Sequence, residues 1–415
     1  MADDSHVEIK LFTKQLQYSV PDSSVSLPDK FGEDELNELV RNLLEAKSSV
    51  NFDFLINGEI FRSNLATVIQ TRGLSREGVI EIEYIESTAA PSPEDSLQHN
   101  DWVSCINCRN NLIVSGCYDN SVHVWDIDTK KRLFSSSRHI APVKSISWIN
   151  DKLFVSGSHD ETALLWRIED KTLACLGVCK GHAASVDTVD SNPTGDKFCS
   201  GSWDNLLKIW SAVKEIESTN DEDDEPSKKK KVENKLPTRL PMMTLAGHAE
   251  GISRCTWNED SQIITSSWDH MLKFWDLEKA SEKRNLNSTK AIFDFSISKI
   301  NQWQILTASA DRHIRLYDIR AEADGTKVQN SYSSHTGWVS SISWCSNNEY
   351  LFVSGSYDNL IKMWDMRSPK LELFNLEGHE DKVLCVDWNV ETTIASGSSD
   401  NTLKIFSYNS RNADD

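Results

Sequence analysis

Histidine, serine or threonine, and aspartate recur together along this 415-residue chain, and hydrolases use these residue types for nucleophilic catalysis. A pair of small residues, such as Ser115-Gly116, is followed three residues later by an aspartate. This pattern occurs seven times, at Asp119, Asp160, Asp204, Asp269, Asp311, Asp358 and Asp400. In six repeats a histidine stands 20–23 residues upstream, four residues before Val or Ile: His99, His139, His182, His248, His335 and His379. The fifth repeat has no such histidine. A hydrolase needs its nucleophile, base and oxyanion hole in one cleft, so six copies favour a structural role over catalysis.

Cys105 and Cys108 form a CxxC pair, a motif that elsewhere binds zinc or carries out redox chemistry. No second pair stands at zinc-finger spacing, and residues i and i+3 of a strand point to opposite faces. We therefore expect both thiols to be structural. The nine cysteines are scattered through a long chain, which is typical of reduced thiols in the cytosol or nucleus.

A large aromatic residue stands six residues after each repeat aspartate: Trp125, Trp166, Trp210, Trp275, Tyr317, Trp364 and Phe406. The aspartates are 41, 44, 65, 42, 47 and 42 residues apart, and all but one spacing lie near the period of a propeller blade. With the Gly-His pairs (as at 181–182) and Trp-Asp pairs (as at 125–126), the repeats resemble the WD40 family. The resemblance implies a mainly β fold, a seven-bladed β-propeller, in which the repeated polar residues form hydrogen-bond chains within the blades.

The boundaries of the propeller follow from the first and last repeats. We place it at 99–410, preceded by a linker and ring-closing strand at 89–98. Few residues follow Phe406, so the last blade lacks an outer strand of its own. Residues 93–99 stand where such a strand should precede the first histidine. We predict that they complete the seventh blade and leave no sheet edge open.

The 65-residue spacing marks an insertion at about 214–240. It contains an acidic run at 221–225 and then a basic run of Lys228, Lys229, Lys230 and Lys231. Such opposite charge blocks cannot bury a core, so we predict a disordered loop. The lysine run is either a nuclear import signal or a solvated part of that loop, and the sequence leaves both interpretations open.

Several aromatic residues fall outside the repeat pattern at positions that lie on propeller loops. Tyr118, Trp203, Trp268 and Tyr357 immediately precede a repeat aspartate, and Trp102 and Trp338 follow a repeat histidine by three residues. On the top-face rim such residues are typical anchors for a protein partner. The alternative is that they only cover the central channel. Trp303, on the opposite face of the fifth repeat, is a second and weaker candidate.

Residues 1–88 carry no repeat and predict a separate α+β domain. Their pattern indicates strands at 7–12, 18–27, 52–56 and 79–85, an amphipathic helix around 36–44 and a helical turn at 65–70. Asn57 and Gly58 predict a tight turn after the third strand. This order of elements resembles the β-grasp fold of ubiquitin-like domains.

The two domains together carry a more specific resemblance. An acidic ubiquitin-like domain directly before a propeller, with Phe-Asp-Phe-Leu-Ile-Asn-Gly at 52–58 and Asn-Asp-Trp-Val-Ser at 100–104, is similar to the WD-repeat ribosome-biogenesis proteins with an N-terminal NLE-type domain. Members of this family are the WD-repeat subunit of the pescadillo–Bop (PeBoW) complex. The resemblance implies assembly of the large ribosomal subunit, maturation of pre-rRNA, and a nucleolar and nucleoplasmic location.

The resemblance also implies partners and one functional carboxylate. In the family the propeller binds a Bop-like WD40 protein within a trimer that includes a pescadillo-like protein. The ubiquitin-like domain binds the adhesion site of the ATPase midasin, which holds Mg²⁺. The family's metal-binding glutamate corresponds to Glu77, so the chain itself needs no cofactor. Mg²⁺ prefers hard oxygen ligands, and one carboxylate from another chain can complete its shell.

The charge balance limits the other function classes. There are 44 Lys and Arg against 63 Asp and Glu, a net charge of −19, which argues against a protein that chiefly coats nucleic-acid phosphates. Direct contact with rRNA stays open. No stretch approaches eighteen apolar residues, so we expect no membrane span. We expect a non-enzymatic scaffold; the alternative is a substrate adaptor of the ubiquitin pathway.

Overall fold

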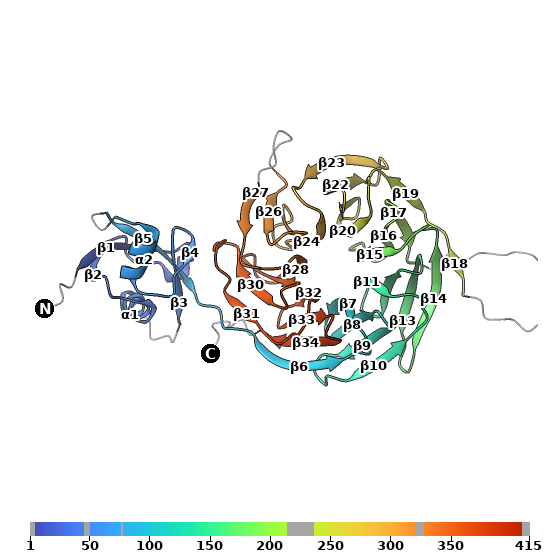
Figure 1. Ribbon diagram of the computed structural model, residues 1–415, viewed down its shortest axis with the longest axis horizontal. Helices are drawn as coiled ribbons and strands as arrows, with labels where there is room; N and C mark the ends of the chain where they lie inside the picture. Colours follow the sequence, from blue (N-terminus) through green and yellow to red (C-terminus); the bar gives the residue numbers. More distant parts are fainter. Residues whose placement is uncertain (1–4, 45–49, 76–77, 214–235, 321–327, 409–415) are drawn as a thin grey trace, which may run out of the picture.

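The computed structural model describes residues 5–44, 50–75, 78–213, 236–320 and 328–408. The described residues form a small α+β domain beside a larger domain of seven sheets arranged as a ring (Figure 1). Each sheet is one blade, and we number the blades in the order of their first strands. No helix among the described residues is long and apolar enough to cross a bilayer.

The front domain has a five-stranded sheet in the order β2-β1-β5-β3-β4, in which the central pair β1 and β5 is parallel. Its helices pack against the sheet with buried faces that include Leu36 and Val40 of α1 and Leu65 of α2. This is the β-grasp order that the sequence predicted. The elements are β1 (His6–Phe12), a 3-10 helix (Leu16–Tyr18), β2 (Ser24–Pro28), α1 (Glu33–Leu43), β3 (Phe52–Ile56), β4 (Glu59–Ile60), α2 (Leu65–Arg72) and β5 (Ile80–Glu86).

The predicted strand at 18–27 is wrong over its first half. The 3-10 helix ends at Tyr18, residues 19–23 are irregular, and β2 begins only at Ser24. Pro21 has no N–H to donate to a neighbouring strand, and its carbonyl accepts a turn bond from Ser23 N. The predicted turn is correct: Asn57 and Gly58 both have positive φ (53° and 74°), the geometry of a two-residue hairpin loop. That hairpin contains β4, which the sequence pattern did not reveal.

Four of the seven propeller blades consist of four consecutive antiparallel strands. Blade 2 gains a fifth strand, β18 (Thr238–Arg239), which lies in the sequence between the last two strands of blade 3, and blade 7 takes its outer strand from before blade 1. Blades 1 to 4 contain β7 (Val103–Arg109), β8 (Leu112–Cys117), β9 (Val122–Asp126), β10 (Arg132–Ser136); β11 (Val143–Trp148), β12 (Leu153–Ser158), β13 (Thr162–Ile168), β14 (Leu173–Lys180); β15 (Val186–Ser191), β16 (Lys197–Ser202), β17 (Leu206–Ser211), β19 (Met243–Ala246); and β20 (Ile252–Glu259), β21 (Gln262–Ser267), β22 (Met271–Asp276), β23 (Ser281–Asn287).

The remaining blades follow the same plan. Blades 5 to 7 contain β24 (Ile292–Ile297), β25 (Gln304–Ser309), β26 (Ile314–Asp318), β27 (Val328–Tyr332); β28 (Val339–Trp344), β29 (Leu351–Ser356), β30 (Ile361–Asp365), β31 (Phe374–Leu376); and β32 (Val383–Val390), β33 (Thr393–Ser398), β34 (Thr402–Ser407) with β6 (Ser92–Gln98). The pairing of β6 with β34, from Ser92↔Ser407 to Gln98↔Thr402, confirms the prediction that this segment supplies the missing strand of blade 7.

Neighbouring blades meet through the small residue of the Ser-Gly step. A Cβ added to Gly157 would lie 2.8 Å from Val186 of the next blade, and one on Gly397 would lie 2.6 Å from Val103. No real Cβ tolerates such a distance. The residue after the serine must therefore be glycine or another small residue, because the Val or Ile that stands four residues after the next histidine packs against it. The second contact joins blade 7 to blade 1.

The insertion between β17 and β19 differs in part from the prediction. Residues 214–235, with Lys228, Lys229, Lys230 and Lys231, lie outside the described residues. Residues 236–240 are described, and β18 (Thr238–Arg239) pairs in parallel with β14 as a fifth strand of blade 2. Arg239 also donates to the carbonyls of Ser211 and Val213. The prediction of disorder is therefore wrong for this part, because its backbone and Arg239 find partners on the outer strand edge.

Candidate protein-interaction face of the propeller

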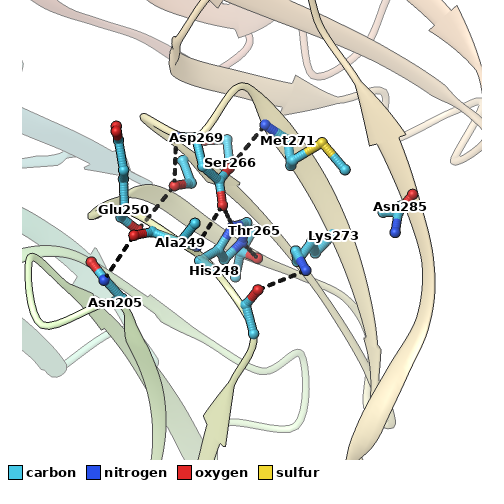
Figure 2. Close-up of polar contacts among 12 residues, drawn as sticks. Asn205, His248, Ala249, Glu250, Thr265, Ser266, Asp269, Met271, Lys273 and Asn285 are labelled. Carbon is cyan, nitrogen blue, oxygen red and sulfur yellow. Dashed lines mark hydrogen bonds and ion pairs between the residues drawn. The ribbon is translucent and has the colours of Figure 1, made fainter.

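The repeated histidine, hydroxyl and aspartate lie together in blades 2, 3, 4, 6 and 7, and Figure 2 shows His248, Thr265 and Asp269 of blade 4. His248 contacts Asp269 through Nδ1 (2.7 Å) and the Thr265 hydroxyl through Nε2 (2.8 Å). Trp275 Nε1 donates to the same hydroxyl (2.8 Å), and Asp269 also accepts from the backbone N–H of Ala249 (2.9 Å). The chain of bonds thus ties the loop before the blade to its second and third strands.

One set of bond directions is compatible with an uncharged histidine. The hydroxyl can accept from tryptophan and give its own hydrogen to Nε2, while the histidine donates from Nδ1 to the carboxylate. A neutral histidine satisfies the whole chain, and burial lowers the pKa of His248 in agreement. Burial alone would raise the pKa of Asp160 and Asp204 in blades 2 and 3, but hydrogen bonds from His139 and His182 help to hold both at about 2.

This geometry does not support hydrolysis. The hydroxyls that would act as nucleophiles are fully buried and each contacts its repeat histidine: Ser156, Ser200, Thr265, Ser354 and Ser396. The first four also accept from the indole N–H of their tryptophan. A nucleophile must reach a substrate carbonyl beside an oxyanion hole. The constellation instead pairs buried polar groups that would destabilise the fold if they were unpaired.

Three blades depart from the pattern. Blade 7 has Phe406 in place of the tryptophan, and a phenyl ring has no N–H to donate to Ser396. In blade 1, His99 contacts the Ser115 hydroxyl (2.9 Å), but its Nδ1 faces the Leu97 carbonyl (3.3 Å). Asp119 bonds Asn100 and Ser121 instead, so the predicted His99–Asp119 link is wrong. Burial and the adjacent His123 lower the pKa of His99 to about 4.

Blade 5 has no repeat histidine, and an arginine from the third strand takes over the aspartate. Arg315 donates to Asp311 through two nitrogens, at 2.6 and 3.3 Å. The turn also differs: the residue after the aspartate has positive φ in the other six blades, as at Asn205 (66°), but Arg312 does not. The carboxylate is therefore retained as a hydrogen-bond acceptor while its partner has changed.

The predicted rim aromatics form two groups at one end of the channel. The larger is a continuous row across blades 3 to 6, with ring centroids 5.1–5.9 Å apart, in the order Trp203, Trp268, Phe293, Trp338 and Tyr357. The smaller is the pair of Trp102 and Tyr118, whose centroids are 5.2 Å apart. We call these seven residues the aromatic rim. The structure thus brings together six residues that the sequence singled out individually.

The aromatic rim surrounds a cavity of about 580 Å³ in the channel, and six of its members line it. Lys144 lies 5.3 Å from the centre of the Tyr118 ring and Lys382 lies 5.5 Å from that of Tyr357, both within cation–π range. Deeper in the cavity Arg254 pairs with Asp294 (3.4 Å). The site therefore offers broad aromatic surface with a few charged groups, as protein interfaces do.

Exposure distinguishes the rim from the tryptophans of the repeat. The Trp338 side chain is 49% exposed and Trp102 43%, whereas Trp166 and Trp364 are fully buried. Trp203 is also largely exposed, but its indole N–H donates to Asp187 (2.5 Å), which fixes the ring. Large exposed aromatic residues in a fixed row are what a partner can use without reordering them.

Trp303 lies elsewhere, on the loop between β24 and β25 at the opposite face. It is 38% exposed, and the Arg320 guanidinium lies 4.7 Å from its ring centre. Arg320 also makes a bidentate ion pair with Asp318, from Nε to Oδ1 (3.1 Å) and from Nη2 to Oδ2 (2.6 Å). This ring is isolated from the aromatic rim and partly covered by its own chain.

The other residues that the sequence singled out are Glu77 and the CxxC cysteines. Glu77 lies outside the described residues. Cys105 and Cys108 are both buried in β7, and burial raises the pKa of Cys105 to about 11 and that of Cys108 well above its usual range. Such thiols stay protonated and are poor metal ligands. Within the described ranges, no cluster of three His, Cys, Asp or Glu side chains is placed to hold a metal ion.

Phe293 is the rim residue that the sequence reasoning missed. It follows Ile292, which corresponds to the Val or Ile that stands four residues after the histidine in the other blades. The corresponding positions are Lys144 in blade 2 and Asp187 in blade 3, and both also border the cavity. Blade 5 has no repeat histidine from which the position of Phe293 could be counted. Ile292 and the strand pattern that follows it are the sequence signal that could have located Phe293 instead.

Comparison with known proteins agrees with both domains. The NLE (NUC135) domain family matches residues 7–69. The WD domain, G-beta repeat family matches six segments: 92–126, 130–167, 173–211, 239–276, 326–365 and 371–407. The unmatched stretch between 276 and 326 contains most of blade 5, the blade without the histidine.

Curated proteins resemble the chain from end to end. A protein of Ixodes scapularis is 43% identical over 426 residues, covering 98% of this chain and 100% of the relative. One of Aedes aegypti is 42% identical, covering 97% and 96%, and one of Drosophila pseudoobscura pseudoobscura is 43% identical with the same coverage. All three are named "Ribosome biogenesis protein WDR12 homolog".

Proposed function

The chain belongs to the family of WDR12-type ribosome biogenesis proteins, and from this premise we propose that it is a non-catalytic assembly factor of the large ribosomal subunit. The observation that carries the proposal is the similarity over nearly the whole chain, which includes the front domain and the repeats. Repeats alone would support only a general interaction role, since one fold serves many functions. The proposed site of action is the nucleolus and nucleoplasm, where large subunits mature.

The propeller supplies the first binding surface. We assign the aromatic rim to a Bop-like WD40 partner, within a complex that also holds a pescadillo-like protein and associates with pre-60S particles. Large aromatic side chains at the centre of an interface contribute most of its binding free energy, and the row from Trp203 to Tyr357 offers several at fixed spacing. The cavity behind the row leaves room for a side chain of the partner.

The front domain supplies the second surface. It has 8 Lys and Arg against 16 Asp and Glu within 1–88, a net charge of −8 that favours an electropositive, metal-bearing partner. In the proposed mechanism Glu77 gives one oxygen to the Mg²⁺ held by the midasin adhesion site, and the ATPase then removes the protein from the particle. The chain brings the carboxylate, and the partner brings the metal and the ATP hydrolysis.

Glu77→Ala tests this assignment directly. We expect it to abolish Mg²⁺-dependent capture of the full chain by the midasin adhesion-site domain, because a metal shell without its sixth ligand loses the bridge between the chains. Glu38→Ala is the matched control, since Glu38 is an exposed glutamate of α1 and its loss changes the net charge equally. Capture that survives Glu77→Ala would remove this residue from the mechanism.

Co-sedimentation distinguishes this proposal from a substrate adaptor of the ubiquitin pathway. A tagged chain should sediment with pre-60S particles and co-purify with the Bop-like and pescadillo-like proteins. Recovery of polyubiquitin or ligase subunits in their place would favour the adaptor. Deletion of residues 228–231 in the same tagged chain tests the import signal. Loss of nuclear accumulation is expected only if the lysines act as a nuclear import signal.

A further inference from the structure

The front domain packs against the outer wall of blade 6 (Figure 1). One apolar cluster contains residues of both domains: Leu55, Ile60 and Ile85 from the front sheet, and Leu351, Leu373, Leu376 and Tyr408 among those from the propeller. All of these side chains are buried. Burial of apolar surface stabilises the contact independently of the connecting chain.

Polar contacts surround this cluster. Arg62 donates to the Leu373 carbonyl (2.7 Å) and lies 5.5 Å from the Phe374 ring centre. Glu59 forms an ion pair with Lys370. A Cβ on Gly58, in the hairpin turn before Glu59, would lie 3.4 Å from the Arg367 carbonyl, so the turn itself touches blade 6. We call Glu59 and Arg62, with Lys370, Leu373 and Phe374, the interdomain latch.

The covalent connection between the domains leads to a weakly held strand. Residues 87–91 join β5 to β6, and β6 is the outer strand of blade 7. In β6, all of which the structure describes, Leu97 is the only buried side chain. Pro93 has no N–H to donate, and a bulge interrupts the pairing with β34 between Ile405 and Phe406. Besides Leu97, this strand is held by its backbone bonds to β34, by the contact between the Ser92 and Ser407 hydroxyls (2.7 Å) and by the ion pair of Glu94 with Lys130.

The path by which a pulling force on the front domain reaches the propeller decides how strongly the β6–β34 bonds are loaded. Tension through 87–91 alone would reach β6 at Ser92, its first residue, and would break the β6–β34 bonds one after another. The interdomain latch instead connects the front domain to the body of blade 6, in parallel with this linker. While the latch holds, blade 6 carries part of the load, so less of it acts on the end of β6.

We propose that the interdomain latch protects blade 7 by transmitting tension on the ubiquitin-like domain to blade 6. The proposed function supplies the source of the tension, an ATPase that pulls on this domain, but the mechanical role needs no partner. The latch also keeps the β3–β4 edge of the front domain occupied by its own propeller. Failure of either proposal would therefore leave the other standing.

Force spectroscopy on the full chain, held by tags at its two ends, tests the proposal. Release of residues 87–98 lengthens the tether by at most about 40 Å, the extended length of twelve residues at roughly 3.4 Å each. We expect this event at a clearly lower force in the Arg62→Ala/Lys370→Ala double variant than in the unmodified chain. The lengthening should stay the same, since the same segment is released.

A matched control removes two ion pairs elsewhere. Lys10→Ala/Arg109→Ala deletes the contacts of Lys10 with Asp22 and of Arg109 with Asp151, both 2.8 Å long and away from the latch. It should leave the force unchanged. Lys370→Ala alone, which replaces a 72% exposed side chain, should give a smaller decrease and serves if the double variant does not fold. Equal forces in the latch variants and the unmodified chain would overturn the proposal.

Discussion

Neighbouring residues in the same turn serve opposite purposes in this propeller. Asp204 points inward, where it accepts hydrogen bonds from His182 (2.8 Å) and from the backbone of Ala183 and Leu206 (both 3.0 Å). Trp203, one residue before it, is largely exposed on the aromatic rim. The same relation holds for Tyr357 and Asp358. A blade turn can thus carry a fixed scaffold group and a free binding group side by side.

The comparison among the seven repeats shows which positions of the turn are constant within this chain and which vary. The carboxylate is present in all seven repeats, even where histidine is absent and Arg315 replaces it. The residue before it is aromatic in four repeats and His159, Ala310 or Ser399 in the others. The inward position is set by the needs of the turn, whereas the outward position is free to serve a partner.

Asp204→Ala should produce the largest change in stability. It leaves the Nδ1–H of His182 and two backbone N–H groups without their acceptor in a buried setting, at a cost of about 3 kcal/mol. Hydrogen exchange of β16 and β17 amides in the full chain measures the free energy of local opening. Protection equal to that of the unmodified chain would show that the network is not a scaffold.

Asp311→Ala should have a smaller effect, and so sharpens the comparison between blade 5 and the complete blades. Its main partner Arg315 is a long side chain that can turn toward water when the carboxylate is lost, so we expect about 1 kcal/mol. The measurement is hydrogen exchange of β25 and β26. A loss as large as that of Asp204→Ala would mean that the arginine fully replaces the histidine network.

The sequence predicted the repeat architecture well because its signals are local and frequent. The fixed six-residue offset from aspartate to a large aromatic defines the turn and third strand of every blade. The outer strand of blade 7 could be predicted as well, since a ring fold without it would leave an edge open. The rim could be located because its residues adjoin the repeat aspartate or histidine.

The missed features depend on contacts between segments far apart in the sequence. The β18 strand has no strand pattern of its own and forms because Thr238 and Arg239 find the edge of β14. Arg62 and Lys370 carry no motif, and only the fold brings the front domain to blade 6. The His99–Asp119 link failed because Ser121 and Asn100 compete for that carboxylate. Periodicity does not report such competition.

The central claim is that the aromatic rim, and not the polar network behind it, binds the partner. Purification of the tagged full chain with Trp338→Ala tests this claim most directly, with Trp303→Ala as the control because that ring is similarly exposed on the opposite face. We expect Trp338→Ala to lower the affinity for the Bop-like partner by about 2 kcal/mol, roughly thirty-fold, while β16 and β17 keep their exchange protection. Full recovery of the partner with Trp338→Ala, or an equal loss with Trp303→Ala, would contradict the account.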